Sequence, residues 1–131
     1  MPRRPTTPAT PELLQGTLEV MILRTLARAP AHGYAVARSI EQASGGVLAI
    51  EEGSLYPALY RLQRRGDLKS SWRTSDTGRR AKVYELTTRG RRQLAEQQDL
   101  WTRLSGAVSR VLAGDAGRAA VVPAGGPGGT P

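Results

Sequence analysis

The sequence predicts a mainly α-helical (α+β) fold, a winged helix-turn-helix followed by a C-terminal dimerisation helix. Three observations predict this fold. Three helical patterns precede a pair of segments that have strand periodicity. The turn between those two segments is basic, as expected for a hairpin that contacts a polyanion. A heptad stripe of apolar residues follows, which is typical of a helix that packs against another helix.

The composition limits the kinds of function. The chain has 131 residues, 39% of them hydrophobic, which suits one domain with a modest core. It has no cysteine and one histidine, which excludes thiolate chemistry and argues against a histidine metal site or a histidine-bearing catalytic triad. No stretch has the apolar length of a signal-peptide core or a membrane span. We therefore expect a cytoplasmic protein that is not an enzyme, with no cofactor, metal or membrane partner.

The net charge of +8 is concentrated in one part of the chain. Residues 61–92 contain eleven basic and three acidic residues, and the rest of the chain contains eight of each. Because Lys and Arg displace counterions from phosphates, such a segment is typical of a surface that binds a polyanion. The alternative is a solvated surface that is basic without a nucleic-acid partner.

The N-terminal half predicts an arm and two helices. Residues 1–11 carry a proline at every third position, which favours extended, disordered chain. Thr10 can cap a first helix over residues 11–28, whose apolar residues fall on two sides. A second helix starts near His32, which we expect to pack or hydrogen-bond there, and ends at Gly45 and Gly46.

A third helix has the composition of a recognition helix. With Ser54 as N-cap, Pro57 falls at the third helical position, where its missing N–H costs no hydrogen bond. The inward side then consists of Leu55, Ala58, Leu59 and Leu62, and the outward side of Pro57, Tyr60, Arg61 and Arg64, with Tyr56 on the flank. Cationic and hydrogen-bonding groups near a helix start suit a DNA major groove. An ordinary amphipathic surface helix is the alternative.

A hairpin follows the third helix. Residues 68–75 and 82–87 alternate with period two, and the turn between them carries Arg79 and Arg80 at its tip. Leu68 and Trp72 fall on the same side, which predicts that Trp72 is a core residue. The helices and the hairpin together form the predicted DNA-binding domain, residues 12–88.

The C-terminal part predicts one helix and a tail. The helix begins at Thr87 or Thr88 and its last part, residues 89–113, carries the heptad positions Leu94, Trp101 and Val108, with Leu104 and Val111 at the second seam position. The tail, residues 114–131, is rich in Gly, Ala and Pro and is predicted to be disordered.

Four segments resemble a known family. "LLQGTLEVMILRTL", "HGYAVARSIE", "GVLAIEEGSLYPALYRLQRRG" and "RRAKVYELTTRGRRQL" are similar to the short subfamily of PadR transcriptional regulators, over about residues 12–112. The resemblance implies a winged-helix homodimer, built mainly with the first and last helices, that represses by binding an operator. It does not extend to the proline-rich arm or the Gly/Pro tail, so it implies no role for them.

Residues and resemblance together give two sets of candidate site residues. The DNA-binding set consists of Tyr34, Gly53, Ser54, Tyr56, Pro57, Tyr60, Arg61, Arg64, Arg73, Arg79, Arg80 and Lys82. The dimerisation set consists of Leu14, Leu18, Leu94, Trp101, Leu104, Val108 and Val111. Tyr34 could instead pack in the core. Some PadR-like dimers hold planar effectors against aromatic side chains at their interface, so Trp101 is also a candidate contact for a small-molecule effector.

Three functions compete at this point. The leading one is a homodimeric repressor whose partners are double-stranded DNA, a second copy of itself and, as an option, a small-molecule effector. A protein-interaction module is the second, and it predicts weak binding to DNA without sequence preference. An enzyme is the third, but the sequence lacks a phosphate-cradling glycine loop followed by lysine and a cluster of metal ligands.

Overall fold

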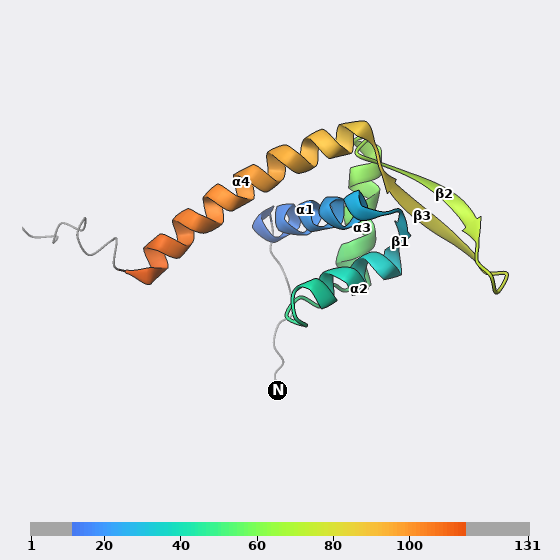
Figure 1. Ribbon diagram of the computed structural model, residues 1–131, viewed down its shortest axis with the longest axis horizontal. Coiled ribbons are helices and arrows are strands. Elements are labelled where there is room, and N and C mark those ends of the chain that lie inside the picture. Colours follow the sequence, from blue (N-terminus) through green and yellow to red (C-terminus); the bar gives the residue numbers. More distant parts are fainter. Residues whose placement is uncertain (1–11, 115–131) are drawn as a thin grey trace, which may run out of the picture. The chain divides into compact units, whose positions relative to one another are not determined.

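The computed structural model describes residues 12–114 and the side chains of residues 16–114 (Figure 1). Its elements, in chain order, are α1 (Glu12–Arg28), β1 (Ala31–His32), α2 (Gly33–Ala43), α3 (Glu52–Arg64), β2 (Leu68–Thr74), β3 (Arg80–Leu86) and α4 (Thr88–Ala113). The chain divides after Gln97 into two compact units, so α4 starts in the first and ends in the second. The predicted arm, the Thr10 cap and the tail beyond Gly114 lie outside the described residues.

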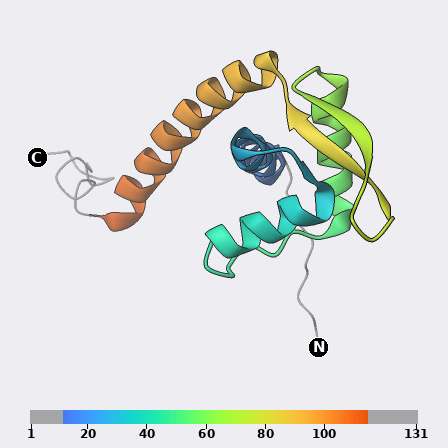
Figure 2. The ribbon, with the colours of Figure 1, turned by 45° about the vertical axis from the view of Figure 1, so that its right-hand side comes forward.

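The first unit is built around α1, which is seen nearly end-on beside α2 and α3 in Figure 2. Its side chains Leu18, Ile22, Leu23 and Leu26 are buried, and Val20, Met21 and Ala27 pack against the same core, so α1 buries two sides as predicted. Helices α2 and α3 contribute Val36, Ile40, Leu55, Ala58, Leu59 and Leu62. Removing this apolar surface from water is the main stabilising contribution, about 1.5–3 kcal/mol for each large side chain.

The unit contains a three-stranded antiparallel sheet in the order β1-β3-β2. The hairpin of β2 and β3 was predicted. In the structure Leu68 pairs with Leu86 at its base. Strand β1 was not predicted, because two residues are too few to show a strand periodicity. Ala31 pairs with Tyr84 and His32 with Val83, which ties the start of α2 to the hairpin.

The hairpin differs from its prediction in two ways. Strand β3 begins at Arg80, so the turn is shorter than expected and contains Arg79 but not Arg80. The Arg79 carbonyl accepts the Ser75 N–H at 2.8 Å. Trp72 is 58% exposed, so its prediction as a core residue is wrong. The reason is length: only Leu68 of β2 is buried, and the hairpin extends beyond the helices (Figure 1).

The start of α3 also differs from its prediction. The N-cap is Glu51 rather than Ser54, and no side chain caps this helix. Pro57 therefore lies inside α3, beyond the first turn. A proline here removes the hydrogen bond to the Gly53 carbonyl, and its ring crowds that carbonyl. Gly53 is exposed, so water can solvate the carbonyl that loses its partner. Helix α3 ends as expected, with Gly66 at a φ of 87° and the Asp67 N–H bonded to the Leu62 carbonyl at 2.9 Å.

The first turn of α4 is fixed to the base of the hairpin. The Thr87 hydroxyl donates to the Gly66 carbonyl at 2.7 Å and accepts the Gly90 N–H at 3.0 Å. A Cβ on Gly90 would overlap the carbonyl oxygen of Asp67, so this close approach requires glycine. The prediction that a helix begins at Thr87 or Thr88 and ends at Ala113 is confirmed.

The element order and the sheet confirm the winged helix-turn-helix fold. Across residues 12–114, every helix is too short or too polar to cross a membrane.

Candidate nucleic-acid interface

The outward side of α3 carries aromatic and polar side chains. Tyr60 is 60% exposed, and Arg64 lies beside it with Nη1 3.4 Å from the Tyr60 hydroxyl and the guanidinium carbon 5.8 Å from the ring centroid. Tyr56 is also exposed. The candidate residues Gly53, Ser54 and Pro57 are exposed near the start of the helix. Helix α3 therefore presents most of its predicted set to solvent.

Arg61 is placed differently from its prediction. Its Nε lies 2.9 Å from Oε2 of Glu19 in α1, and its side chain is 35% exposed. Glu19 also accepts from Arg65, with 2.7 Å between Oε1 and Nη2. The hydrogen bond to Glu19 raises the pKa of Arg65, burial opposes the shift, and the charges of Glu19 and Asp67 add to it. Because Glu19 holds both guanidinium groups against α1, Arg61 does not project outward with Tyr60.

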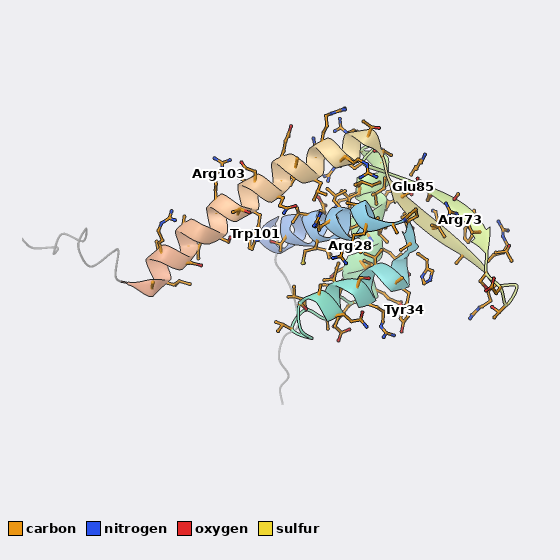
Figure 3. All side chains as sticks on the ribbon, in the orientation of Figure 1. Arg28, Tyr34, Arg73, Glu85, Trp101 and Arg103 are labelled. Carbon is orange, nitrogen blue, oxygen red and sulfur yellow. The ribbon has the colours of Figure 1, made fainter. Side chains whose placement is uncertain are left out.

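The hairpin supplies exposed cations. Arg73, Arg79 and Arg80 are exposed, and Arg73 projects from β2 in Figure 3. The Arg80 guanidinium carbon lies 5.1 Å from the centroid of the Trp72 ring. Lys82 is half-buried, and its Nζ lies 5.8 Å from the centroid of Tyr84. The hairpin thus places cations next to aromatic rings, and the cation–π attraction stabilises the position of the cation and of the ring.

The start of α2 lies beside this surface. His32 caps the helix, with Nδ1 accepting the Ala35 N–H at 3.3 Å, which confirms its predicted role as a helix-start residue. Tyr34 is exposed on α2 rather than packed in the core (Figure 3). Arg38 Nη1 donates to its hydroxyl at 3.2 Å. That hydrogen bond raises the pKa of Arg38. Gly33 is buried under Tyr56, whose ring would lie only 2.8 Å from a Cβ at this position.

Sequence reasoning missed the buried carboxylate that joins three elements. Asp67 is 1% exposed, with Oδ1 3.0 Å from Arg89 Nε and Oδ2 3.6 Å from Arg65 Nε. It lies between the end of α3 and the start of β2, and Arg89 belongs to the first turn of α4. An Asp directly after a helix-ending glycine carries no recognisable signal for such a role, so its partners had to come from the structure.

The candidate dimerisation residues fall into two groups. Leu18 and Leu94 are buried in the core of the first unit, so they are not available on its surface. Leu14 lies in α1, but its side chain is outside the described part. In the second unit Trp101, Leu104, Val108 and Val111 are exposed, with Trp101 at 40%. Trp101 and Arg103 project from different sides of α4 (Figure 3). The heptad spacing puts Leu104, Val108 and Val111 on the side of Trp101.

The described residues include no group of three or more His, Cys, Asp or Glu side chains that could hold a metal ion.

Comparison with known proteins places these features in a family. The sequence profile described as the transcriptional regulator PadR-like family matches residues 22–96. A PadR family transcriptional regulator from Eggerthella lenta is 36% identical, with a TM-score of 0.64 over 77% of this chain and 86% of that one. A PadR-like transcription factor from Bacteroides fragilis is 31% identical, with a TM-score of 0.63 over 76% and 94% of the two chains. A PadR-like transcriptional regulator from Bacillus cereus is 28% identical, with a TM-score of 0.67 over 80% and 100%.

Proposed function

Since the chain belongs to the PadR-like family of transcriptional regulators, we propose that it is a repressor that binds a pseudo-palindromic operator as a homodimer. Two copies of α3 would enter successive major grooves about one helical turn apart, and the hairpins would hold the flanking phosphates. Repression follows if the operator overlaps the promoter, because bound protein then occludes it.

The observation that carries this proposal is the surface shared by α3 and the hairpin. Arg64 of α3 lies beside the exposed Tyr60, and Arg73, Arg79 and Arg80 of the hairpin are exposed. Asp67, between α3 and β2, is buried in its ion pairs with Arg65 and Arg89. The exposed Asp76 lies in the hairpin turn, where the cations Arg73, Arg79 and Arg80 outnumber it. Cations supply phosphate attraction, and the tyrosine and serine side chains near the start of α3 can contact base edges.

Helix α3 itself contributes less cationic charge than its sequence indicates. Arg61 is held by Glu19 and Arg65 is shared between Glu19 and Asp67, which leaves Arg64 as the α3 arginine that points away from α1. We therefore place base reading on Ser54, Tyr56 and Tyr60, and assign phosphate contacts to Arg64 and the hairpin.

The homodimer is supported by the apolar stripe of the second unit. An exposed stripe of Trp101, Leu104, Val108 and Val111 at heptad spacing is stabilised when a second helix covers it. A planar effector held against Trp101 would change how two such helices pack, and so change the spacing of the two α3 helices. Titration of the fluorescence of a Trp72→Phe variant, in which Trp101 is the one remaining tryptophan, with candidate planar compounds tests this effector step.

Selection from a pool of randomised duplexes tests the proposed function. The full chain should enrich duplexes with two inverted half-sites whose centres lie about 10 base pairs apart. Recovery of single half-sites would contradict the homodimer, and recovery of no shared sequence would contradict an operator-binding regulator. A reporter gene placed behind the recovered duplex should then be expressed less when the protein is present; increased expression would contradict repression.

A further inference from the structure

A series of ion pairs joins α1, the end of α3 and the start of α4 within the first unit. Oε1 of Glu19 in α1 lies 2.7 Å from Nη2 of Arg65, the residue that follows α3. Nε of Arg65 lies 3.6 Å from Oδ2 of Asp67, and Oδ1 of Asp67 lies 3.0 Å from Nε of Arg89 in the first turn of α4. We call these four residues the ion-pair joint. Its two carboxylates and two guanidinium groups alternate from α1 to α4.

Asp67 is the central member of the ion-pair joint. It is 1% exposed, and it is the one buried charged side chain among residues 16–114. The side chains of its partners are 47% exposed for Arg65 and 52% exposed for Arg89. Taking a carboxylate out of water costs free energy that an ion pair often only offsets, so apolar side chains of similar size would stabilise this point about as well. The distinctive effect of a buried charge is that its partners must adopt one arrangement around it.

The first turn of α4 is attached to the end of α3 in two ways. The Thr87 N–H donates to the Asp67 carbonyl at 3.1 Å, and Gly90 packs against the same carbonyl, so these contacts fix the point at which α4 begins. Leu94 packs in the core further on, but apolar contacts are non-directional and allow one helix to turn on another. The pair of Arg89 with the Asp67 carboxylate depends on direction, so it fixes the orientation of this first turn.

The orientation of the first turn of α4 matters for operator binding, because the same helix carries the apolar stripe of the proposed dimer. Helix α4 is continuous from Thr88 to Ala113. In that dimer the two α3 helices belong to different copies, and the copies meet through the apolar stripe. The separation of the two α3 helices then depends on how firmly each α3 is fixed to its own α4. A joint that permits one arrangement therefore selects one spacing of half-sites.

We propose that Asp67 is a positioning residue that sets the spacing of the operator half-sites. This rests on the proposed function, and it assigns spacing specificity to a joint at the opposite end of α3 from Ser54. With Arg65 and Arg89 both held by the Asp67 carboxylate, the first turn of α4 has one orientation on α3. Without the carboxylate the two arginines separate, the first turn takes several orientations, and half-sites at several spacings are bound.

The test uses the operator recovered by selection, made as a series of duplexes in which the half-sites are moved apart or together by one or two base pairs. For the unmodified chain, a change of two base pairs should weaken binding about thirtyfold, because it rotates one half-site by about 70° around the duplex. Asp67→Asn keeps the size of the side chain and removes its charge, and it should reduce this spacing penalty to about threefold or less. Its affinity for a duplex with one half-site should stay within about twofold of that of the unmodified chain, because the surface of α3 and the hairpin is unchanged.

Two further variants separate positioning from loss of folding and from general effects of charge. Arg89→Gln changes a half-exposed side chain and leaves Asp67 paired with Arg65, so it should reduce the spacing penalty to about tenfold. Asp99→Asn removes an exposed ion pair with Arg103 on the same helix and should keep the full penalty. Thermal unfolding of each variant shows whether the first unit is folded, and Arg89→Gln decides the question if Asp67→Asn does not fold.

The outcomes distinguish the two proposals. If the folded variants of Asp67 and Arg89 keep the full spacing penalty, the positioning role is wrong while operator binding stands. If they weaken binding to the single half-site as much as to the operator, the ion-pair joint only stabilises the fold, and the positioning role is again wrong. If the unmodified chain has no preference for the selected duplex, operator binding fails and the positioning role fails with it.

Discussion

Arg61 of α3 is held by Glu19 of α1, with 2.9 Å between Arg61 Nε and Glu19 Oε2. An arginine near the middle of a recognition helix would ordinarily be assigned to a guanine, which accepts two hydrogen bonds from a guanidinium group. Here Glu19 lies within the first unit, is 12% exposed at its side chain, and also binds Arg65. The pair fixes the position of α3 on α1 rather than a contact with DNA.

This relationship predicts different effects for two neighbouring arginines. Arg64→Ala should weaken binding to all duplexes and lower the slope of log Kd against log salt concentration by about 0.9 for each protomer. Arg61→Ala should leave that slope and the base preference unchanged, and should lower the free energy of unfolding by about 1–2 kcal/mol because Glu19 loses one partner. Anisotropy titrations at several salt concentrations, together with urea unfolding, measure both. A relaxed preference at one base pair in Arg61→Ala would show that Arg61 leaves Glu19 to read DNA.

The joint between the hairpin and α4 predicts a stability effect at Arg89. Arg89→Ala leaves the buried Asp67 carboxylate with Arg65 alone, whose Nε is 3.6 Å away. We expect the free energy of unfolding to fall by about 1–3 kcal/mol, the cost of a buried charged group that loses a hydrogen bond. Arg92→Ala, at an exposed position of the same helix, is the matched control and should change it by less than about 0.5 kcal/mol. Equal effects of the two variants in urea unfolding would contradict the role of Asp67.

The apolar stripe of the second unit predicts the behaviour of two α4 variants. Leu104→Glu places a charge in the proposed helix–helix contact and should shift the dimer to monomer in sedimentation velocity, because the desolvation of an unpaired carboxylate opposes association. Arg103→Ala, next to it but on a different side of α4, removes only an exposed ion pair with Asp99 and should leave the dimer intact. A dimer that survives Leu104→Glu would place the contact elsewhere.

Tyr84 predicts a pH dependence of stability. Burial raises the pKa of Tyr84 above its ordinary value of 10.0, and the proximity of Tyr56 adds to the shift. The folded state therefore keeps the hydroxyl proton to higher pH than the unfolded state does. The contribution of the protonated Tyr84 hydroxyl to the free energy of unfolding is complete below pH 10. It is lost as the pH rises through the folded-state pKa, so the free energy of unfolding should fall in that range. Tyr84→Phe should remove this part of the decline in urea unfolding between pH 8 and 11; an unchanged pH dependence would contradict it.

The fold was predictable because its elements have strong local signals. Helical periodicity, the glycines that end α2 and α3, and the alternation of β2 with β3 identified most of the first unit. Strand β1 was missed because it is stabilised by its pairing with β3 and has no pattern of its own. The start of α3 was misplaced because Pro57 was assumed to fit only the first turn, whereas the exposed side of α3 carries it further in.

The outline of the site was predictable, but the predicted positions of particular side chains were wrong. Exposed Arg64, Tyr60 and the hairpin arginines follow from the helical wheel and the turn. The position of Arg61 depends on Glu19, which is 42 residues away in sequence, and no local pattern records such a partner. Trp72 was misjudged because alternation gives the side of a strand but not whether anything covers that side.

Fluorescence anisotropy tests operator binding by the surface of α3 and the hairpin most directly. The titrations use the DNA upstream of the protein's own gene and a scrambled duplex, each at two salt concentrations. The unmodified chain should prefer the native duplex at both, and an Arg79→Ala/Arg80→Ala double variant should bind both duplexes more weakly with a smaller salt slope. Equal binding of the two duplexes that vanishes at the higher salt concentration would mean that the basic surface supplies only phosphate attraction, which would contradict a sequence-specific regulator at this site.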